Sequence, residues 1–263
     1  MSLPVYEAIG FQQILEKGGH SKPWIVLINM KDSLKPYVVK LYKTIDIEAR
    51  NKMTAEVMGN VLAGEFGLKA PAAAIIDFTP QFRMQLNDTC EEVLTQVDER
   101  PKFGCEFLDG SYLYSPQTDR KTTTDLLNPT LLYAFDYFIC NRDRTINKSN
   151  LLVKQNETYL IDHEMGLEIT SQSISDFTEG IWDSRYQNHL FYKFLKNTRG
   201  DKSNLFDEFL LYLQEFNFQR LMPYFTQLED LGFTTHKELI LEYWNMIQKK
   251  STIFASILST SIQ

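Results

Sequence analysis

Short apolar runs alternate with turn-forming residues in the first part of the chain. Residues 24–30 (WIVLINM) and 37–42 (YVVKLY) are rich in β-branched and aromatic side chains and are separated by KDSLKP. This pattern predicts a β-hairpin, preceded by the turn-forming segment KGGHSKP. Apolar residues then recur at helical spacing over residues 45–67. Gly67 and Pro71 predict the end of that helix, and AAAIIDF after them is typical of another strand.

The later part of the chain has a helical character. Residues 130–140 (TLLYAFDYFIC) are apolar nearly all round, which predicts a buried helix. Residues 205–216, 220–231 and 237–258 are further candidate helices, rich in aromatic side chains. Residues 80–130 contain prolines and glycines between short apolar pieces and allow no firm assignment. The pattern predicts an α+β fold, with room for two lobes.

Composition excludes several classes of protein. The chain has 263 residues and 43% apolar content, enough for a sizeable core. Its net charge of −7, from 34 acidic and 27 basic side chains, argues against direct nucleic-acid binding. It does not exclude ATP, because a nucleotide site needs only local positive charge. No apolar run reaches the ~20 residues that span a bilayer, and the N-terminus does not resemble a signal peptide.

Cysteine and histidine usage points to a cytoplasmic protein without structural zinc. Cys90, Cys105 and Cys140 form neither a metal-binding pair nor an even set for disulfides. The four histidines lack the spacing of zinc ligands. A reducing cytoplasm is the simplest interpretation.

Residues 140–166 (CNRDRTINKSNLLVKQNETYLIDHEMG) carry the most informative chemistry. LLV and TYLI, separated by KQNE, predict a second hairpin that brings Asn150 at its entry close to Asp162 at its exit. Asp143 lies shortly before it. One carboxylate can orient a hydroxyl nucleophile, while an amide and a second carboxylate can hold magnesium on nucleotide phosphates. We therefore expect a phosphoryl-transfer site, with Asp143 catalytic and Asn150 and Asp162 as metal ligands.

Each of these residues also has a purely structural interpretation. Asp143 fits a turn in which its side chain bonds its own backbone. Asn150 could be a turn residue that enters a strand, and Asp162 could cap amides at a strand end. Their joint placement around one hairpin favours the site.

Several motifs in order resemble the HipA-like kinases, relatives of the protein-kinase and phosphoinositide-kinase fold. N-x-D-R, N-L-L and I-D-H follow one another within residues 141–163. Upstream, GGHSKPWIV resembles the family's glycine-containing loop, PYVVKLY its lysine-bearing strand, EVMGNVLAGEFGLKAP its next helix and FGCEFL its hinge. The resemblance covers roughly residues 10–168. It implies a bilobal protein kinase-like fold, with a nucleotide-binding N-lobe over residues 1–108 and a C-lobe over residues 109–263.

The resemblance also implies ATP and Mg²⁺ as cofactors and assigns further residues. Lys40 would contact the α- and β-phosphates, and Glu56 would pair with it, with Glu65 as its rival; the alternative for Lys40 is an exposed strand lysine. Asn141, Arg144 and Asp136 would shape the catalytic loop. The remaining nucleotide contacts would come from a flexible phosphate-side loop and from backbone groups of the hinge: Gly18, Gly19, His20, Ser21, Lys22, Glu106 and Leu108.

The catalytic segment departs from the related kinases in two places. Those kinases place an asparagine five residues after the catalytic aspartate, where this chain has Lys148. Asn147 stands four residues on and Asn150 seven; Asn150 is preferred because it directly precedes the strand. Thr145 stands where some relatives carry histidine.

Three functions follow from these features. The first is a serine/threonine protein kinase, the acceptor being what the resemblance implies. The second is a small-molecule kinase of the aminoglycoside-phosphotransferase type, which also ends a hairpin with a sequence like IDHE. The third is a pseudokinase, supported by the two departures. HipA-like proteins can belong to toxin–antitoxin systems, so a regulatory partner is a further expectation. The substrate, the oligomeric state and autophosphorylation of Ser21 stay open.

Overall fold

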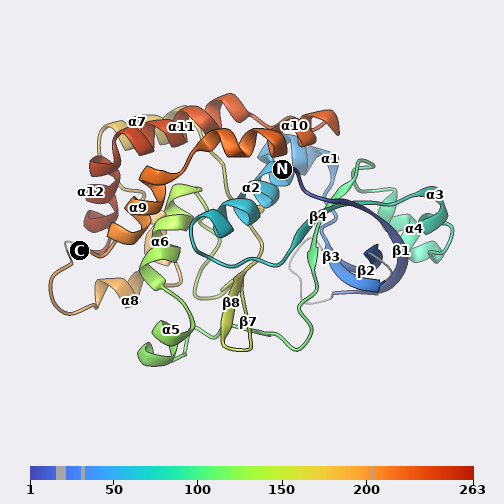
Figure 1. Cartoon of the computed structure of the whole chain (residues 1–263), viewed down its shortest axis with the longest axis horizontal. Helices are drawn as coiled ribbons and strands as arrows, with labels where there is room; N and C mark the ends of the chain where they lie inside the picture. Colours follow the sequence, from blue (N-terminus) through green and yellow to red (C-terminus); the bar gives the residue numbers. More distant parts are fainter. Residues whose placement is uncertain (16–21, 31–32, 203) are drawn as a thin grey trace. The chain divides into compact units, whose positions relative to one another are not determined.

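The computed structural model describes residues 1–15, 22–30, 33–202 and 204–263 (Figure 1). The predicted α+β class is confirmed, with a β-rich N-terminal region and a helical remainder. The chain forms two compact units. The first contains Met1–Met58, Pro71–Asp109 and Leu221–Thr235, and the second contains Gly59–Ala70, Gly110–Arg220 and His236–Gln263. No helix among the described residues combines the length and the apolar character needed to cross a membrane.

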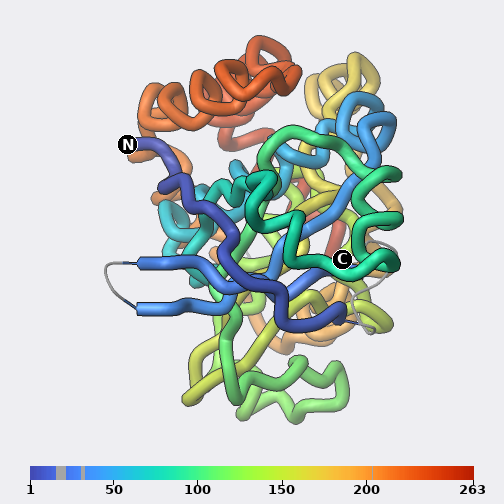
Figure 2. Tube along the Cα trace, turned by 90° about the vertical axis from the view of Figure 1, so that its right-hand side faces the viewer, coloured from blue at the N-terminus to red at the C-terminus, as the bar shows by residue number. Residues whose placement is uncertain are grey.

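A closed five-stranded barrel forms the centre of the first unit. Its strands follow the order β1-β2-β3-β5-β4, and Figure 2 shows β2 and β3 side by side. All neighbours are antiparallel except β1 and β4, which are parallel. The predicted hairpin is β2 and β3, and alternate residues of β2 (Trp24, Val26 and Ile28) are buried in the barrel core. The strands are β1 Val5–Ile14, β2 Trp24–Met30, β3 Ser33–Val39, β4 Ala73–Asp77 and β5 Lys102–Glu106.

The helix predicted over residues 45–67 is two helices. These are α1 (Thr44–Arg50) and α2 (Lys52–Glu65). Asn51 separates them in a left-handed conformation with φ 52°, and its side-chain amide donates to the carbonyl of Thr235 at 2.9 Å. A tertiary hydrogen bond therefore stabilises a break that the apolar pattern does not reveal. Two short helices, α3 (Pro80–Arg83) and α4 (Asp88–Leu94), complete this part of the unit.

A late segment of the chain, residues 221–235, returns to the first unit. It contains α10 (Met222–Asp230). The side chain of Gln227 accepts from the backbone N–H of Leu3 at 2.9 Å and donates to its carbonyl at 2.8 Å. Arg100 donates to the carbonyl of Gly232 at 2.5 Å, and its side chain stacks over the ring of Phe233. These bonds explain why the segment belongs with the barrel.

The second unit is built around α6 (Pro129–Phe138), the buried helix that the sequence predicted. Nine of its residues are buried. The predicted second hairpin is also present, as β7 (Leu151–Lys154) and β8 (Glu157–Leu160), with β6 (Tyr112–Leu113) beside β7. Gln155 and Asn156 form its turn, both with positive φ, as a two-residue hairpin turn of type I′ requires.

The helical remainder differs in detail from the prediction. The helix expected over residues 237–258 is divided at Lys250 into α11 (Lys237–Lys249) and α12 (Ser251–Ser261). The segment 205–216 contains α9 (Asp207–Glu215), while 220–231 contains the end of the 3-10 turn η3 (Phe218–Leu221) and α10. The other elements are α5 (Arg120–Leu126), α7 (Ser171–Thr178), η2 (Ser184–Asn188) and α8 (Tyr192–Lys196).

The predicted division after residue 108 lies close to the junction at Asp109 and Gly110, but two segments differ. Residues 221–235 belong to the first unit and residues 59–70 to the second. Phe66 accounts for the latter. Its ring packs 4.9 Å from that of Phe209 and 5.3 Å from that of Phe138, measured between centroids, within the aromatic core of the second unit.

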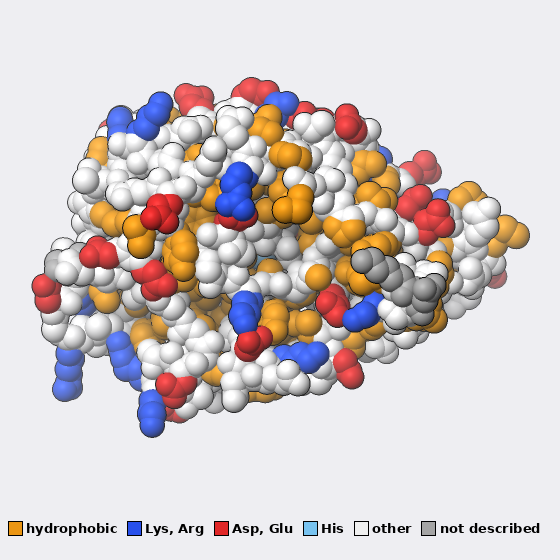
Figure 3. Space-filling view, in the orientation of Figure 1, with side chains coloured by type: hydrophobic (Ala, Val, Ile, Leu, Met, Phe, Trp, Pro, Cys, Tyr) orange, Lys and Arg blue, Asp and Glu red, His pale blue; other side chains and the backbone are white. Residues whose placement is uncertain are grey.

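Charged side chains of both signs are interspersed over the described residues of the face in Figure 3. That mixture accompanies the net negative charge of the sequence. The expected lack of nucleic-acid binding stays a prediction.

Candidate active site

Lys40 and Glu56 form a buried ion pair in the first unit. Lys40 directly follows β3, and its Nζ lies 2.6 Å from Glu56 Oε1. The Tyr42 hydroxyl donates to the same carboxylate oxygen at 2.8 Å. The two charged side chains are only 11% and 1% exposed, and a buried pair of this kind is stable only if both partners are kept. The predicted pairing is therefore present, and its role toward nucleotide remains a prediction.

The rival residue Glu65 has a different partner. Its carboxylate lies 2.8 Å from the guanidinium of Arg220, within the second unit. This contact leaves Glu56 as the partner of Lys40.

The other predicted nucleotide contacts are less well defined. Gly18, Gly19, His20 and Ser21 lie outside the described residues, whereas Lys22 is described and exposed. In the predicted hinge, the backbone N–H of Glu106 donates to the carbonyl of Ala72 at 2.9 Å. That N–H is thus engaged within the sheet, and the adenine contact expected of the Glu106 backbone stays a prediction. The carbonyl of Glu106 and the backbone of Leu108 stay as predictions.

In the second unit, Asp136 lies in the last turn of α6 and organises the loop that follows this helix. Its carboxylate accepts from Arg144 Nε at 2.7 Å and from Asn141 Nδ2 at 2.9 Å, and it lies 3.0 Å from His189 Nε2. The side chains of Asp136 and Arg144 are completely buried. The loop-shaping roles expected of Asn141, Arg144 and Asp136 are thus present as contacts.

The charge states in this network follow from its partners. Burial alone would raise the pKa of Asp136, but Arg144 and His189 outweigh it and lower the pKa to about 2. Burial lowers the pKa of His189, opposed by its bond to Asp136. The backbone N–H of Phe191 donates to His189 Nδ1 at 3.1 Å. The neutral ring therefore carries its proton on Nε2, and this N–H donates a hydrogen bond to the Asp136 carboxylate.

Arg144 extends the network to the start of the hairpin. Its guanidinium donates to the backbone carbonyl of Asn150. Asn150 and Asp162 both have left-handed backbones, with φ 49° and 62°. Asparagine and aspartate tolerate this conformation better than most residues, and such strain persists only where the surroundings hold it in place. The backbones of the two residues that were predicted as metal ligands are therefore held by their surroundings.

The hairpin register brings the three predicted chemical groups together. Leu151 pairs with Leu160, and the N–H of Ile161 donates to the carbonyl of Asn150 at 3.1 Å. Asn150 and Asp162 thus lie at the same end of the hairpin, although twelve positions separate them. The side-chain amide nitrogen of Asn150 donates to Asp143 Oδ2 at 3.2 Å. The side-chain oxygen of Asn150, Oδ1, is then the atom that could bind a metal.

Lys148 bridges two of these groups. Its Nζ lies 2.5 Å from Asp143 Oδ2 and 2.7 Å from Asp162 Oδ2. Burial opposes the charge, but the two carboxylates outweigh it and raise the pKa of the Lys148 ammonium above its ordinary value. Sequence reasoning noted Lys148 only as a departure, and its spacing does not reveal this contact.

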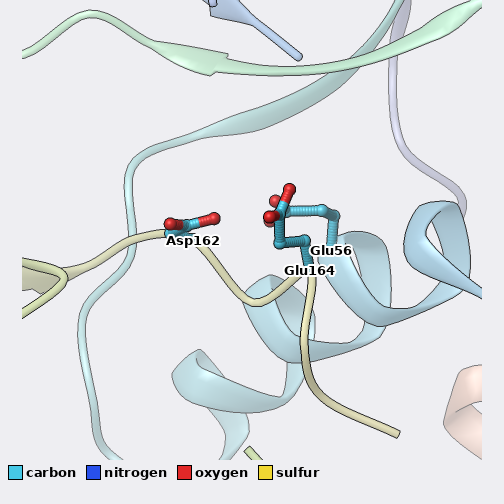
Figure 4. A group of neighbouring side chains, drawn as sticks. All are labelled: Glu56, Asp162 and Glu164. Atoms are coloured by element: carbon cyan, nitrogen blue, oxygen red, sulfur yellow. The ribbon is translucent and has the colours of Figure 1, made fainter. Parts of the chain in front are cut away.

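Glu164 is a third carboxylate that sequence reasoning did not assign. Figure 4 shows it two residues after Asp162 on the segment that follows β8, and it also shows Glu56 on α2. Ligand oxygens of Asp162 and Glu164 lie within 4.8 Å of each other. The I-D-x-E sequence at residues 161–164 was the only hint in the sequence that Glu164 lies near Asp162. Carboxylate and amide oxygens suit Mg²⁺, so Asn150, Asp162 and Glu164 fit this ion by their chemistry.

A cavity of about 280 Å³ lies beside the loop that follows α6. Cys140, Arg142 and Asp183 are among its lining residues, whereas Asp143 is not. Arg142 Nε donates to Asp183 Oδ2 at 2.6 Å. This ion pair holds the loop on one side, while the next residue, Asp143, carries the proposed chemistry.

The fold is similar to that of one solved kinase. The crystal structure of a Helicobacter pylori proinflammatory kinase, CtkA, matches with a TM-score of 0.52 and 12% sequence identity over 98% of each chain. At this identity the likeness concerns the fold alone. No curated protein matches the sequence significantly.

A sequence profile of HipA-like kinases matches residues 13–212. Because the match spans more than half of the sequence, the chain belongs to the HipA-like kinase family. The resemblance identified from the motifs is confirmed.

Proposed function

We propose that this chain is an ATP- and Mg²⁺-dependent kinase that phosphorylates serine or threonine hydroxyls of a protein. The observation that carries the proposal is the convergence of Asp143, Asn150 and Asp162 at one end of the β7–β8 hairpin. The family supports kinase chemistry. The protein acceptor and an antitoxin-like partner remain predictions of that resemblance, and a cytoplasmic location remains a prediction from the cysteine usage.

The proposed roles follow the chemistry of each side chain. Asp143 would orient the acceptor hydroxyl and take up its proton as the oxygen attacks the γ-phosphorus and the bond to the β–γ bridging oxygen breaks, releasing ADP. Asn150, Asp162 and Glu164 would hold Mg²⁺, which neutralises phosphate charge when bound. Lys40, held by Glu56, would contact the phosphates. The catalysis would consist of positioning and electrostatic stabilisation.

The test is the intact mass of the protein after incubation with MgATP. We compare the wild type with Asp143→Asn and with Asp125→Asn, a matched change at an exposed position of α5. We expect phosphate on the wild type and on Asp125→Asn, and none on Asp143→Asn. Equal phosphate on all three would remove Asp143 from the chemistry.

The same incubation is repeated with labelled ATP and dephosphorylated casein as a general acceptor. Label on casein supports a protein substrate. ADP release that appears only with an added aminoglycoside would favour the small-molecule kinase instead.

A pseudokinase is the second candidate, and Lys148 is the observation that favours it. Its ammonium contacts both Asp143 and Asp162, which are the groups that phosphate transfer would require. Binding of MgATP without transfer to any acceptor would establish this alternative.

A further inference from the structure

Lys148 contacts two carboxylates that have different proposed roles. One N–H of its ammonium reaches Asp143 Oδ2 at 2.5 Å, and another reaches Asp162 Oδ2 at 2.7 Å. The lysine side chain is 39% exposed, whereas those of Asp143 and Asp162 are 27% and 15% exposed. The ammonium of Lys148 thus contacts two partly buried anions at once.

The backbone of Lys148 is held in place close to these anions. Its N–H donates to the carbonyl of Thr145 at 3.1 Å, and its carbonyl accepts from the N–H of Thr145 at 2.9 Å. Arg144, next to this turn, is fixed by Asp136. With its backbone held, Lys148 can leave the carboxylates by rotation of its own long side chain.

An ammonium and a divalent cation cannot share these oxygens freely. A protonated lysine has three donors and no acceptor, so it can never be a metal ligand itself. The Asp162 oxygen that it contacts is a proposed metal ligand. A divalent ion placed at that oxygen would also stand next to the ammonium, and the two positive charges would repel each other.

We propose that Lys148 is a resident cation that excludes a free divalent ion from Asp162, so that metal enters together with nucleotide phosphates. The phosphates supply negative charge to both cations, and Lys148 then leaves Asp162 for a phosphate oxygen. This inference rests on the proposed function. It makes the metal affinity of the nucleotide-free protein a property that Lys148 controls.

The test measures Mn²⁺ binding to the nucleotide-free protein by the electron paramagnetic resonance signal of the unbound ion. The proteins compared are the wild type, Lys148→Met and Lys148→Arg. Lys121→Met, an exposed lysine of α5 in the same unit, removes the same charge elsewhere and is the matched control. Each variant is first checked for a native thermal unfolding transition.

We expect Lys148→Met to bind Mn²⁺ about tenfold more tightly than the wild type, since loss of one adjacent charge is worth about one factor of ten at a partly exposed site. Lys148→Arg and Lys121→Met should bind like the wild type. Adding a non-hydrolysable ATP analogue should tighten Mn²⁺ binding to the wild type and reduce its difference from Lys148→Met.

Two outcomes would overturn the proposal. One is a Lys148→Met variant that binds Mn²⁺ no more tightly than the wild type. The other is tight binding that survives in Lys148→Met/Asp162→Asn, because the ion would then not be bound at Asp162. The measurement requires no phosphate transfer, so a protein without kinase activity would refute the proposed function and leave this result standing.

Discussion

Replacement of Asp136 by asparagine tests whether the buried network holds the loop that follows α6. The side chain keeps its shape and loses its charge. The carboxylate now accepts from Arg144 and Asn141 and lies next to the neutral ring of His189. In Asp136→Asn the guanidinium of Arg144 stays fully buried without its counter-charge.

Two routes give the size of the effect. The pKa of Asp136 is lowered from 3.8 to about 2, which corresponds to about 2 kcal/mol in favour of the ionised form. Removing one partner of a buried ion pair typically costs about 3–5 kcal/mol. We expect a loss of about 3–5 kcal/mol, because the pKa shift of Asp136 does not contain the cost of leaving the Arg144 guanidinium buried and unpaired. The total stability of a domain is about 5–15 kcal/mol, so the loss should be conspicuous.

The assay is urea unfolding of Asp136→Asn, Arg144→Met and the double variant, with Asp125→Asn as the control. The double variant should be more stable than the sum of the single losses predicts, by at least about 2 kcal/mol, because it contains no unpaired buried charge. A loss below about 1 kcal/mol in Asp136→Asn, or strictly additive losses, would refute the reasoning.

The pH dependence of the wild type has a definite sign for Asp136. Its folded pKa lies below its unfolded pKa, so its contribution to stability is present above about pH 4 and disappears as the pH falls through about 2. Asp136→Asn should lack this part of the acid transition. A steep acid transition that is identical in both proteins would assign it to other groups.

Three further predictions concern other parts of the structure. A Cβ on Gly59 would lie 2.5 Å from His163 Cβ, so Gly59→Ala should lower the free energy of unfolding in urea by about 1–3 kcal/mol. In the same helix, a Cβ on Gly64 meets nothing within 4 Å, so Gly64→Ala should raise the free energy of unfolding by up to about 1 kcal/mol. Equal effects of the two substitutions would contradict this. Lys40→Met should weaken binding of a fluorescent ATP analogue by at least about tenfold, and unchanged binding would exclude a phosphate contact. Since burial lowers the folded pKa of His189, stability should fall as the pH drops below about 6.5, and a His189→Asn variant whose stability declines as steeply over this range would rule out that origin.

Local sequence patterns predict those parts of the fold that depend on near neighbours. Apolar runs around short polar connections identify both hairpins, and the second hairpin brings Asn150 to Asp162 by register alone. The resemblance leads to the pairing of Lys40 with Glu56. In each case, one element or one motif of known geometry is sufficient to predict the contact.

The features that were not predicted depend on distant contacts or on side-chain direction. The break at Asn51 is stabilised by a carbonyl that lies 184 positions further on. The bridge from Lys148 to Asp143 and Asp162 depends on where a long side chain points after a tight turn. Glu164 had a spacing signal, but no pattern distinguishes a ligand from an exposed glutamate at that position.

The return of residues 221–235 to the first unit has a consequence for synthesis on the ribosome. A chain grows from its N-terminus, and domains generally fold as they emerge. Here the partner of Leu3 is Gln227, and the partner of Asn51 is Thr235. The barrel strands are therefore made long before the segment that completes their unit. During that interval the nascent first unit lacks its last hydrogen bonds, so it should depend on chaperones more than a unit made from one continuous stretch would.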